Sequence, residues 1–444
     1  MSGIAGIAHT GKQADVKRML EKIAHRGVAA DVIETDAVTL GCTWPKAQSV
    51  TAKHLKHSST AYDSPGDGHF VLVRGNDFLI KRGALGVAPL YYGWTDDGLL
   101  CFASEVKGLL EFTRNVHELP PGHVFDGQEL EAYSRLGKLP VLQDPPEAMV
   151  KELRRRLEVA VEKRLGAGEV GSWLSGGLDS SALAALARPH FAVFHTFTAG
   201  LPGAPDVVNA QVVAEAIWSE HHVRTVRPKD LLAVLPEVIY HLESFDAWLV
   251  RSSVMNYLVA QMAADYVPAV FSGEGGDELF AGYEYLKTLD PAQLPDELVD
   301  ISSRLHNTAL QRVDRCAAAH GSVAHVAFLD PNVVDYALRI PAEYKLHQGV
   351  EKWILRQAVA DVLPDSIVNR PKAKFWQGAG VEELLAEHAD AQISDADFAR
   401  QRRLSNGWVL NTKEELLYYR IFQEHFGAFE NLGWMGRTKG AAVQ

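Results

Sequence analysis

The residues with the clearest chemical potential lie in the segment 170–181, which reads VGSWLSGGLDSS. An apolar run leads into Ser175, Gly176 and Gly177, and a helical stretch follows. The glycines let the backbone turn sharply and approach a ligand, and the unpaired amides at a helix start attract an anion. Since no lysine follows the glycines, the loop differs from a Walker P-loop, and Asp179 is available to hold magnesium. The segment predicts a phosphate-binding loop.

A second segment of this kind reads FSGEGGDELFAGY over residues 271–283 and follows the short apolar run 269–271. Two carboxylate-bearing loops after two strands of one sheet would form a metal clamp between Asp179 and Asp277. A single Gly-Asp cluster is more often only a turn. Two such clusters in this order and spacing favour a functional site.

The composition is that of a two-domain enzyme, since 444 residues with 47% hydrophobic content exceed what one core usually supports. A formal net charge of -12 disfavours nucleic acid or an acidic membrane as the main partner, because both would repel the protein. The three cysteines show no spacing for zinc or a disulfide framework, and the histidines form no spaced metal set. With no visible signal peptide or membrane span, we expect a cytoplasmic protein.

A proline-rich link over residues 138–146 divides the chain. Before it, alternating runs predict antiparallel strands at 70–74, 77–81 and 99–103. After it, a helical pattern from 147 to about 165 leads into strands that alternate with helices, which predicts a parallel, helix-covered sheet. These strands are expected at 170–174, 192–198, 222–226 and 268–272. We assign residues 1–143 and 147–436 to two domains and 437–444 to a mobile tail.

The Ser-Gly-Gly-x-Asp-Ser-Ser pattern resembles the pyrophosphate loop of the ATP pyrophosphatases, which split ATP between the α and β phosphates. The segment 271–283 resembles the signature of the asparagine synthetases and their relatives. Further segments match that family in order: 82–92, 103–107, 195–206, 243–246, 328–330, 351–356 and 370–378. The resemblance implies an α/β fold with a C-terminal parallel-sheet domain of the ATP-pyrophosphatase, adenine nucleotide α-hydrolase-like type. It also implies a smaller N-terminal Ntn-hydrolase-like α+β domain.

The same resemblance implies a set of site residues. Glu274 would accept a proton and Lys352 would stabilise an oxyanion. Asp179 and Asp277 would hold Mg2+. The residues expected to bind ATP and pyrophosphate are Leu174, Ser175, Gly176, Gly177, Asp179, Ser180, Ser181, Thr198, Ala199, Ser272, Gly273, Lys372 and Lys374. Those expected to bind the substrate are Glu243, Asp246, Trp248, Arg251 and Gly275.

The N-terminal part departs from the family. Members that hydrolyse glutamine carry a cysteine directly after the initiator methionine, whereas this chain has Ser2. A serine alkoxide is far harder to generate than a thiolate at neutral pH. The glutamine-gripping segments of the family are also not found between residues 27 and 68. We interpret the domain as vestigial and structural, with an active serine glutaminase as the alternative.

The synthetase part departs as well. The β-lactam synthetases also lack the cysteine, but they generally carry tyrosine where this chain retains Glu274. Asparagine synthetases have two threonines where this chain has Trp248 and Leu249, which replaces hydrogen-bonding groups with apolar bulk. This favours an unusual carboxylate over aspartate, unless Trp248 merely packs in the core.

We therefore predict an ATP-dependent ligase that adenylates a small, amino-acid-like carboxylate, forms AMP and pyrophosphate, and couples the acyl group to an amine donor without glutamine hydrolysis. The product would be an amide or a β-lactam of specialised metabolism, such as antibiotic biosynthesis. An ammonia-dependent asparagine synthetase and a catalytically inactive scaffold are the alternatives. ATP and Mg2+ are the expected cofactors, and the sequence leaves a homodimer open.

Overall fold

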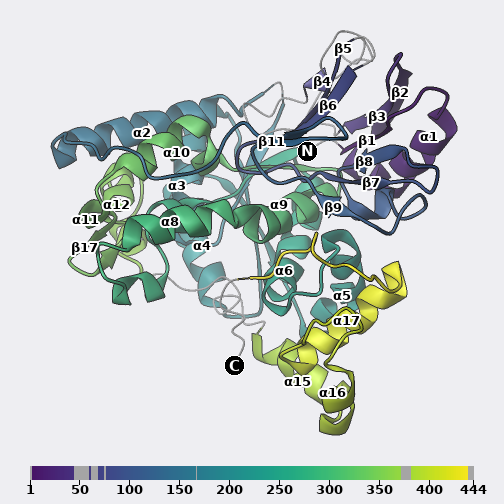
Figure 1. Ribbon diagram of the computed structural model, residues 1–444. Coiled ribbons are helices and arrows are strands. Elements are labelled where there is room, and N and C mark those ends of the chain that lie inside the picture. Colours follow the sequence, from purple (N-terminus) through teal and green to yellow (C-terminus); the bar gives the residue numbers. More distant parts are fainter. Residues whose placement is uncertain are drawn as a thin grey trace.

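The computed structural model describes residues 3–44, 60–61, 69–74, 77–166, 168–371 and 382–438 (Figure 1). A five-stranded parallel sheet forms the centre of the larger part, in the order β14-β13-β12-β15-β16. Its strands are β12 (Val170–Trp173), β13 (His195–Gly200), β14 (Glu220–Thr225), β15 (Ala269–Phe271) and β16 (Val323–His325). From β12 the chain adds β13 and then β14 on one side. It then crosses back and adds β15 and β16 on the other side of β12. The strand order therefore reverses at β12, where ligands bind in open α/β sheets.

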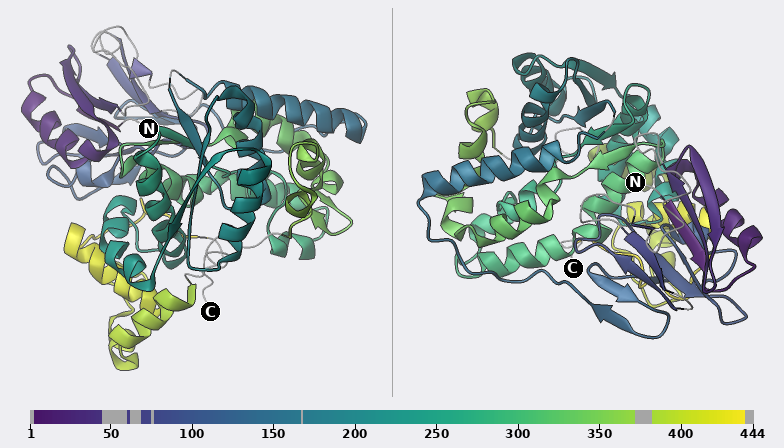
Figure 2. Two further views of the ribbon diagram at one scale, coloured as in Figure 1. Left: turned by 180° about the vertical axis from the view of Figure 1, so that it is seen from behind. Right: turned by 90° about the horizontal axis from the view of Figure 1, so that it is seen from above.

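Helices cover both faces of this sheet, as the two views of Figure 2 show. One face carries α3 (Leu178–Ala187) and α4 (Pro205–Ala216), with α2 (Pro146–Glu162) packed on α3. The other face carries α6 (Ala247–Ala264) and α9 (Ala309–Ala318), with α5 (Pro228–Leu242) beside them. Because both faces are covered, the strands are built from buried residues such as Val270 and Phe271.

The remaining elements of the larger part are short or peripheral. They are α7 (Gly276–Leu279), α8 (Leu294–Ser303), α10 (Pro331–Arg339), α11 (Ala342–Lys345), β17 (Leu346–His347), β18 (Val350–Glu351), α12 (Trp353–Val359), α13 (Asp365–Val368), α15 (Glu382–Gln392), α16 (Asp395–Gln401) and α17 (Lys413–Phe426). The last three form the yellow-green group at the lower right of Figure 1.

The N-terminal part consists of two antiparallel sheets and a helix, α1 (Gln13–Lys22). One sheet has the order β2 (Ala29–Glu34), β3 (Thr39–Trp44), β1 (Gly3–Ile7), β8 (Leu100–Ala103), β7 (Tyr91–Trp94) and β9 (His117–Glu118). The other has the order β11 (Leu130–Ala132), β10 (His123–Phe125), β6 (Asp77–Arg82), β5 (His69–Arg74) and β4 (Thr60–Ala61). Ile4, Phe102, Ile80 and Phe125 belong to one core between the two sheets, and α1 packs on β1 and β3. The α/β fold class predicted from the sequence is confirmed.

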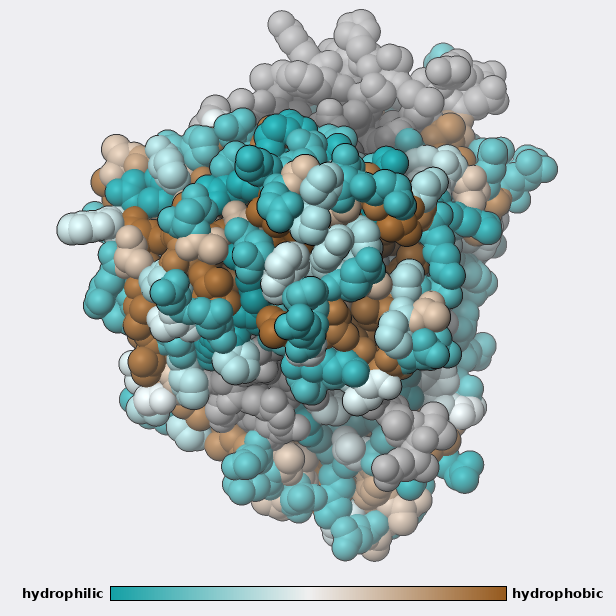
Figure 3. Space-filling view, turned by 90° about the vertical axis from the view of Figure 1, so that its left-hand side faces the viewer, coloured by the Kyte–Doolittle hydropathy of each residue, from teal (hydrophilic) through white to brown (hydrophobic). Residues whose placement is uncertain are grey.

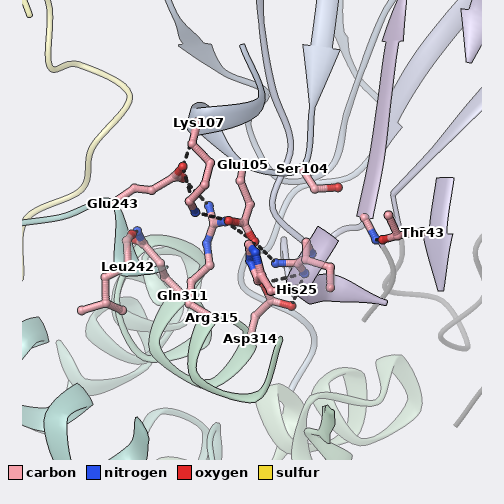
Figure 4. A network of polar contacts seen from close by, with 12 residues as sticks. His25, Thr43, Ser104, Glu105, Lys107, Leu242, Glu243, Gln311, Asp314 and Arg315 are labelled. Atoms are coloured by element: carbon pink, nitrogen blue, oxygen red, sulfur yellow. Dashed lines mark hydrogen bonds and ion pairs between the residues drawn. The ribbon is translucent and has the colours of Figure 1, made fainter. Parts of the chain in front are cut away.

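Buried charges join the two parts (Figure 4). Glu105 follows β8 and forms ion pairs with Arg26 at 2.6 Å and with Arg315 of α9 at 2.9 Å. Arg26 also reaches Asp314 of α9 at 2.7 Å. Although burial acts to raise it, the pKa of Glu105 is held well below its usual range by Arg315, His25 and Lys107. The N-terminal part is therefore held against α9 by buried ion pairs.

The face that Figure 3 shows, on the side of α2 and α12, is mostly hydrophilic, with apolar patches separated by polar side chains. Within the described residues, no helix combines the length and the apolar character that a membrane crossing demands.

We predict that Glu105→Gln lowers the free energy of unfolding by about 3–5 kcal/mol, because it leaves buried cations without their carboxylate. Glu111→Gln is the matched control, since Glu111 pairs with Arg18 at 2.6 Å on the surface and should contribute less than about 1 kcal/mol. Urea denaturation of both variants checks this. Equal stability of the two would contradict the assigned role of the buried network.

Candidate active site

A cavity of about 240 Å³ opens at the carboxyl edge of the parallel sheet, where the strand order reverses. The loops after β12 and β15 both contribute to its wall, and the end of β13 adds Thr198 and Ala199. The residues of the sequence-predicted site that line it are Leu174, Ser175, Gly177, Asp179, Ser180, Thr198, Ala199, Ser272, Gly273, Glu274, Asp277 and Lys352. The fold thus brings the two glycine-rich segments together, although about a hundred residues separate them.

The loop after β12 is built to present backbone amides. Gly176 has a φ of 67° and lies so close to α4 that a Cβ atom there would come within 2.5 Å of the Ala210 nitrogen. Only glycine fits both constraints. Gly177 is the N-cap of α3 and supplies no side chain to the first turn. Ser175 and Ser180 place their hydroxyls 3.1 Å apart beside the loop. The helix start can therefore accept an anion.

The strongest charges in the cavity meet at one point. The ammonium group of Lys352 forms an ion pair with Asp179 and another with Asp277, the latter at 2.6 Å. Lys352 is 2% exposed and occupies the left-handed region with a φ of 57°. Such a backbone costs roughly 1–3 kcal/mol and is found mainly where function requires it. The contacts of Lys352 with Asp179 and Asp277 offset this cost and keep the residue in its strained conformation.

Glycines surround this charge centre because no side chain would fit. A Cβ atom on Gly276 would overlap the carboxylate of Asp179, and one on Gly282 would overlap Asp277 and the Lys352 side chain. A magnesium ion fits this donor set, because two carboxylate oxygens from different loops already converge on one cation. Asp179 and Asp277 are the residues that would hold it.

Glu274 also lines the cavity and is paired with the guanidinium of Arg312, which comes from α9. Burial disfavours the charged guanidinium, but Glu274 outweighs it and raises the pKa of Arg312. The pairing holds the Glu274 carboxylate in the cavity wall. A carboxylate in this position can accept a proton from an attacking amine.

A further acid lies behind the cavity wall. The hydroxyl of Tyr283, which lines the cavity, donates a hydrogen bond to Glu278. Burial, together with the charges of Asp277 and Glu274, raises the pKa of Glu278 to about 7. Glu278 therefore changes its charge close to neutral pH.

The sequence-based prediction missed several residues of the cavity. Arg370 donates to Asp206 at 2.8 Å and lies 3.4 Å from the carbonyl oxygen of Ser175, so a cation covers the phosphate loop. Asn256 and Val259 of α6 line another side. Tyr283 and Arg370 belong to segments that matched the family, which could have indicated them, whereas no local signal marked Arg312. Lys372 and Lys374 lie outside the described residues.

The structure places the other predicted residues away from the described cavity wall. Gly176 lies within the loop and Ser181 lies in α3, and neither lines the cavity. Gly275 does not line it either, but supplies the left-handed turn before α7, with a φ of 96°. Glu243 accepts hydrogen bonds from the backbone amides of residues 106 and 107 and from Arg315, at the junction of the two parts. Its described contacts are structural, and its part in substrate binding stays a prediction.

The start of α6 is tied to the C-terminal segment. Asp246 caps the helix and accepts hydrogen bonds from the backbone and hydroxyl of Thr438, at 3.0 and 2.9 Å. Arg251 pairs with Glu414 of α17 at 2.8 Å and lies over the Trp248 ring. These residues hold α17 and the chain end against α6. Arg437 pairs with Glu415 of α17. Two residues of the predicted mobile tail, 437 and 438, therefore have described contacts, and the rest of that tail lies outside the described residues.

Comparison with known proteins agrees with this geometry. A family model described as asparagine synthase matches residues 152–300 and 291–438. The chain belongs to the asparagine synthase family. Asparagine synthetase [glutamine-hydrolyzing] 2 of Arabidopsis thaliana is 33% identical over 398 residues, which cover 81% of this chain and 67% of the relative. A probable asparagine synthetase [glutamine-hydrolyzing] of Dictyostelium discoideum is 32% identical over 80% of this chain and 72% of its own length.

A solved structure of NMN synthetase from Francisella tularensis aligns with 65% of this chain and 98% of its own at 14% identity, but its TM-score of 0.31 is too low to support a conclusion. Family membership, together with the cavity, supports an ATP-dependent, amide-forming ligase.

We predict that Gly282→Ala weakens the affinity for ATP in the presence of Mg2+ by about tenfold or more, because the added methyl group displaces Asp277 and Lys352 at a cost of roughly 1–3 kcal/mol. Isothermal titration calorimetry measures this. Gly137→Ala is the matched control, because a Cβ atom there meets nothing within 4 Å. If Gly282→Ala and Gly137→Ala bound ATP equally well, the close packing around Asp277 and Lys352 would not be needed for ATP binding.

The raised pKa of Glu278 predicts how stability depends on pH. Between its ordinary value of 4.5 and about 7, the folded protein holds a proton that the unfolded chain has lost. This group therefore lowers the free energy of unfolding as pH rises through that window, by roughly 1.4 kcal/mol per unit. Glu278→Gln should remove this slope, as measured by urea denaturation at pH 5.5 and 7.5. Glu284→Gln, an exposed neighbour, serves as control, and an unchanged slope in Glu278→Gln would contradict the assignment.

Proposed function

We propose that this chain is an AMP-forming ligase that adenylates an amino-acid-like carboxylate and transfers the acyl group to an amine without hydrolysing glutamine. The observation that carries this proposal is the meeting of Asp179, Asp277 and Lys352 beside the Ser-Gly-Gly loop in one cavity. The 33% identical relative named asparagine synthetase supports the same chemistry.

In the first step the substrate carboxylate attacks the α phosphorus of ATP in line with the departing pyrophosphate. The start of α3 and the hydroxyls of Ser175 and Ser180 bind the outgoing negative charge. Arg370 covers the same loop and is suited to the same task. Magnesium, when bound by Asp179 and Asp277, would neutralise phosphate charge and assist the leaving group.

In the second step an amine attacks the carbonyl carbon of the acyl adenylate, and AMP leaves. Glu274 is positioned to accept the proton that the amine loses, and Arg312 holds its carboxylate in place. The Lys352 ammonium stabilises the oxyanion that develops on the carbonyl oxygen. Burial strengthens this effect, because the charge acts in a medium of low dielectric.

The source of the amine follows from the N-terminal part. Glutamine hydrolysis would need a strong nucleophile at the chain start, and this sequence has Ser2, which lies outside the described residues. The buried charges of Glu105 and Arg315 give the domain a structural purpose that does not depend on catalysis. We infer that the amine comes from free ammonia or from the substrate itself, and that an intramolecular amine would give a lactam of specialised metabolism.

An ammonia-dependent asparagine synthetase is the second candidate. Glu274 favours this candidate, because asparagine synthetases carry glutamate at the same place in the motif. The names of the relatives, which are asparagine synthetases, favour it as well. Trp248 and Leu249 stand where asparagine synthetases have two threonines, and although neither lines the described cavity, this difference favours a carboxylate other than aspartate.

A panel assay separates these candidates. Pyrophosphate release is measured with ATP, Mg2+ and a panel of amino-acid carboxylates, each with ammonium, with glutamine or with no added amine, and products are identified by mass spectrometry. We expect release with a carboxylate other than aspartate, supported by ammonium or by no added amine, and not by glutamine. Asp277→Asn should abolish release, whereas Ser2→Ala should leave it unchanged.

Release with aspartate and ammonium alone would establish the asparagine synthetase instead. Dependence on glutamine that Ser2→Ala removes would reveal a working serine glutaminase. Silence across the panel would favour an inactive scaffold.

A further inference from the structure

Three potential metal ligands meet on the outer strands of the parallel sheet, at the end opposite to the cavity. His195 begins β13, and Glu220 and His222 lie on the neighbouring edge strand β14. The register pairs His195 with Glu220 and Phe197 with His222. Since side chains alternate along a strand, His195, Glu220 and His222 point to the same face. The site is built by strand pairing, because Glu220 comes 25 positions after His195 in the sequence.

The ligand atoms are close enough to share one ion. His195 Nδ1 lies 3.0 Å from His222 Nε2 and 3.6 Å from Glu220 Oε2, and one ligand atom from each residue falls within 4.8 Å of the others. Donor atoms around a tetrahedral zinc ion at about 2.0–2.2 Å lie roughly 3.3–3.6 Å from one another. Small rotations of the side chains would therefore complete the coordination.

Aromatic neighbours hold the imidazoles in position. The His222 ring stacks on Phe197 at 5.1 Å between centroids and contacts Tyr266 at 3.9 Å. The Glu220 carboxylate is 61% exposed, whereas the His195 side chain is only 18% exposed. The two imidazoles are thus packed against aromatic rings, and the carboxylate is the solvent-exposed member of the set.

We propose that His195, Glu220 and His222 form a binding site for a zinc-class divalent cation that ties the edge strand β14 to β13. Two nitrogen donors and one oxygen donor suit zinc and similar transition metals, whereas magnesium prefers oxygen donors alone. The site is distinct from the Asp179–Asp277 centre. Thr198, which reaches the cavity, lies three residues after His195 on β13, or about 10 Å along the strand.

The test uses the full-length protein and two probes, Zn2+ and Co2+. Zinc affinity is measured by competition with a chromogenic chelator, and bound Co2+ is detected by its visible absorption, which becomes intense in a four-coordinate site with nitrogen ligands. The variants are His195→Gln, His222→Gln and Asp277→Asn. The matched control is His190→Gln, which replaces an exposed histidine five residues before the site.

We expect one Zn2+ per chain and a rise in melting temperature on its addition. His195→Gln and His222→Gln should each weaken zinc affinity by more than about tenfold, because loss of even an outer partner of a ligand costs roughly 10–100-fold. Both variants should also lose the Co2+ spectrum, while His190→Gln and Asp277→Asn retain it. The proposal is overturned if the wild-type protein binds no Zn2+, or if binding survives in His222→Gln and disappears in Asp277→Asn.

Discussion

The cavity depends on one constraint, which is that two carboxylates from the first turns of α3 and α7 share a single buried cation. Lys352 can contact Asp179 and Asp277 together only because β12 and β15 are neighbours in a parallel sheet and their loops leave it at the same edge. Gly276 and Gly282 leave room for these three side chains, because a Cβ atom at either position would overlap them. The same edge supplies the helix start that can bind phosphate, so nucleotide binding and charge neutralisation come from one feature of the fold.

Helix α9 connects this centre to the N-terminal part. Arg312 points to Glu274 in the cavity, while Asp314 and Arg315, two and three residues later, pair with Arg26 and Glu105. The N-terminal part thus holds the helix that carries a cation of the cavity wall. Because unpaired buried charges are costly, the domain cannot be removed without leaving the charges of α9 exposed or unpaired, which gives the domain a structural role whether or not it also has a catalytic one.

Much of this arrangement could be predicted from local sequence signals. The phosphate loop, the Asp277 segment and strands β12 to β15 each carry a short-range pattern of apolar residues, glycine and carboxylate. Contacts between distant residues could not be predicted in the same way. Arg312 has no local signal that directs it to the cavity, and the three-residue strand β16 is too short for a pattern. Glu243 and Arg251 are engaged by partners far along the chain. The His195, Glu220 and His222 set arises only once two strands are paired in register.

The central claim is that ATP is split at its α phosphorus by a carboxylate next to the Asp179, Asp277 and Lys352 centre. The most direct measurement follows 18O from the carboxylate, starting with labelled aspartate and using any other carboxylate that supports pyrophosphate release. Mass spectrometry of the nucleotide products after turnover should find one 18O atom transferred to AMP, with pyrophosphate formed in equal amount. ADP as the product, with the label in inorganic phosphate, would contradict the account.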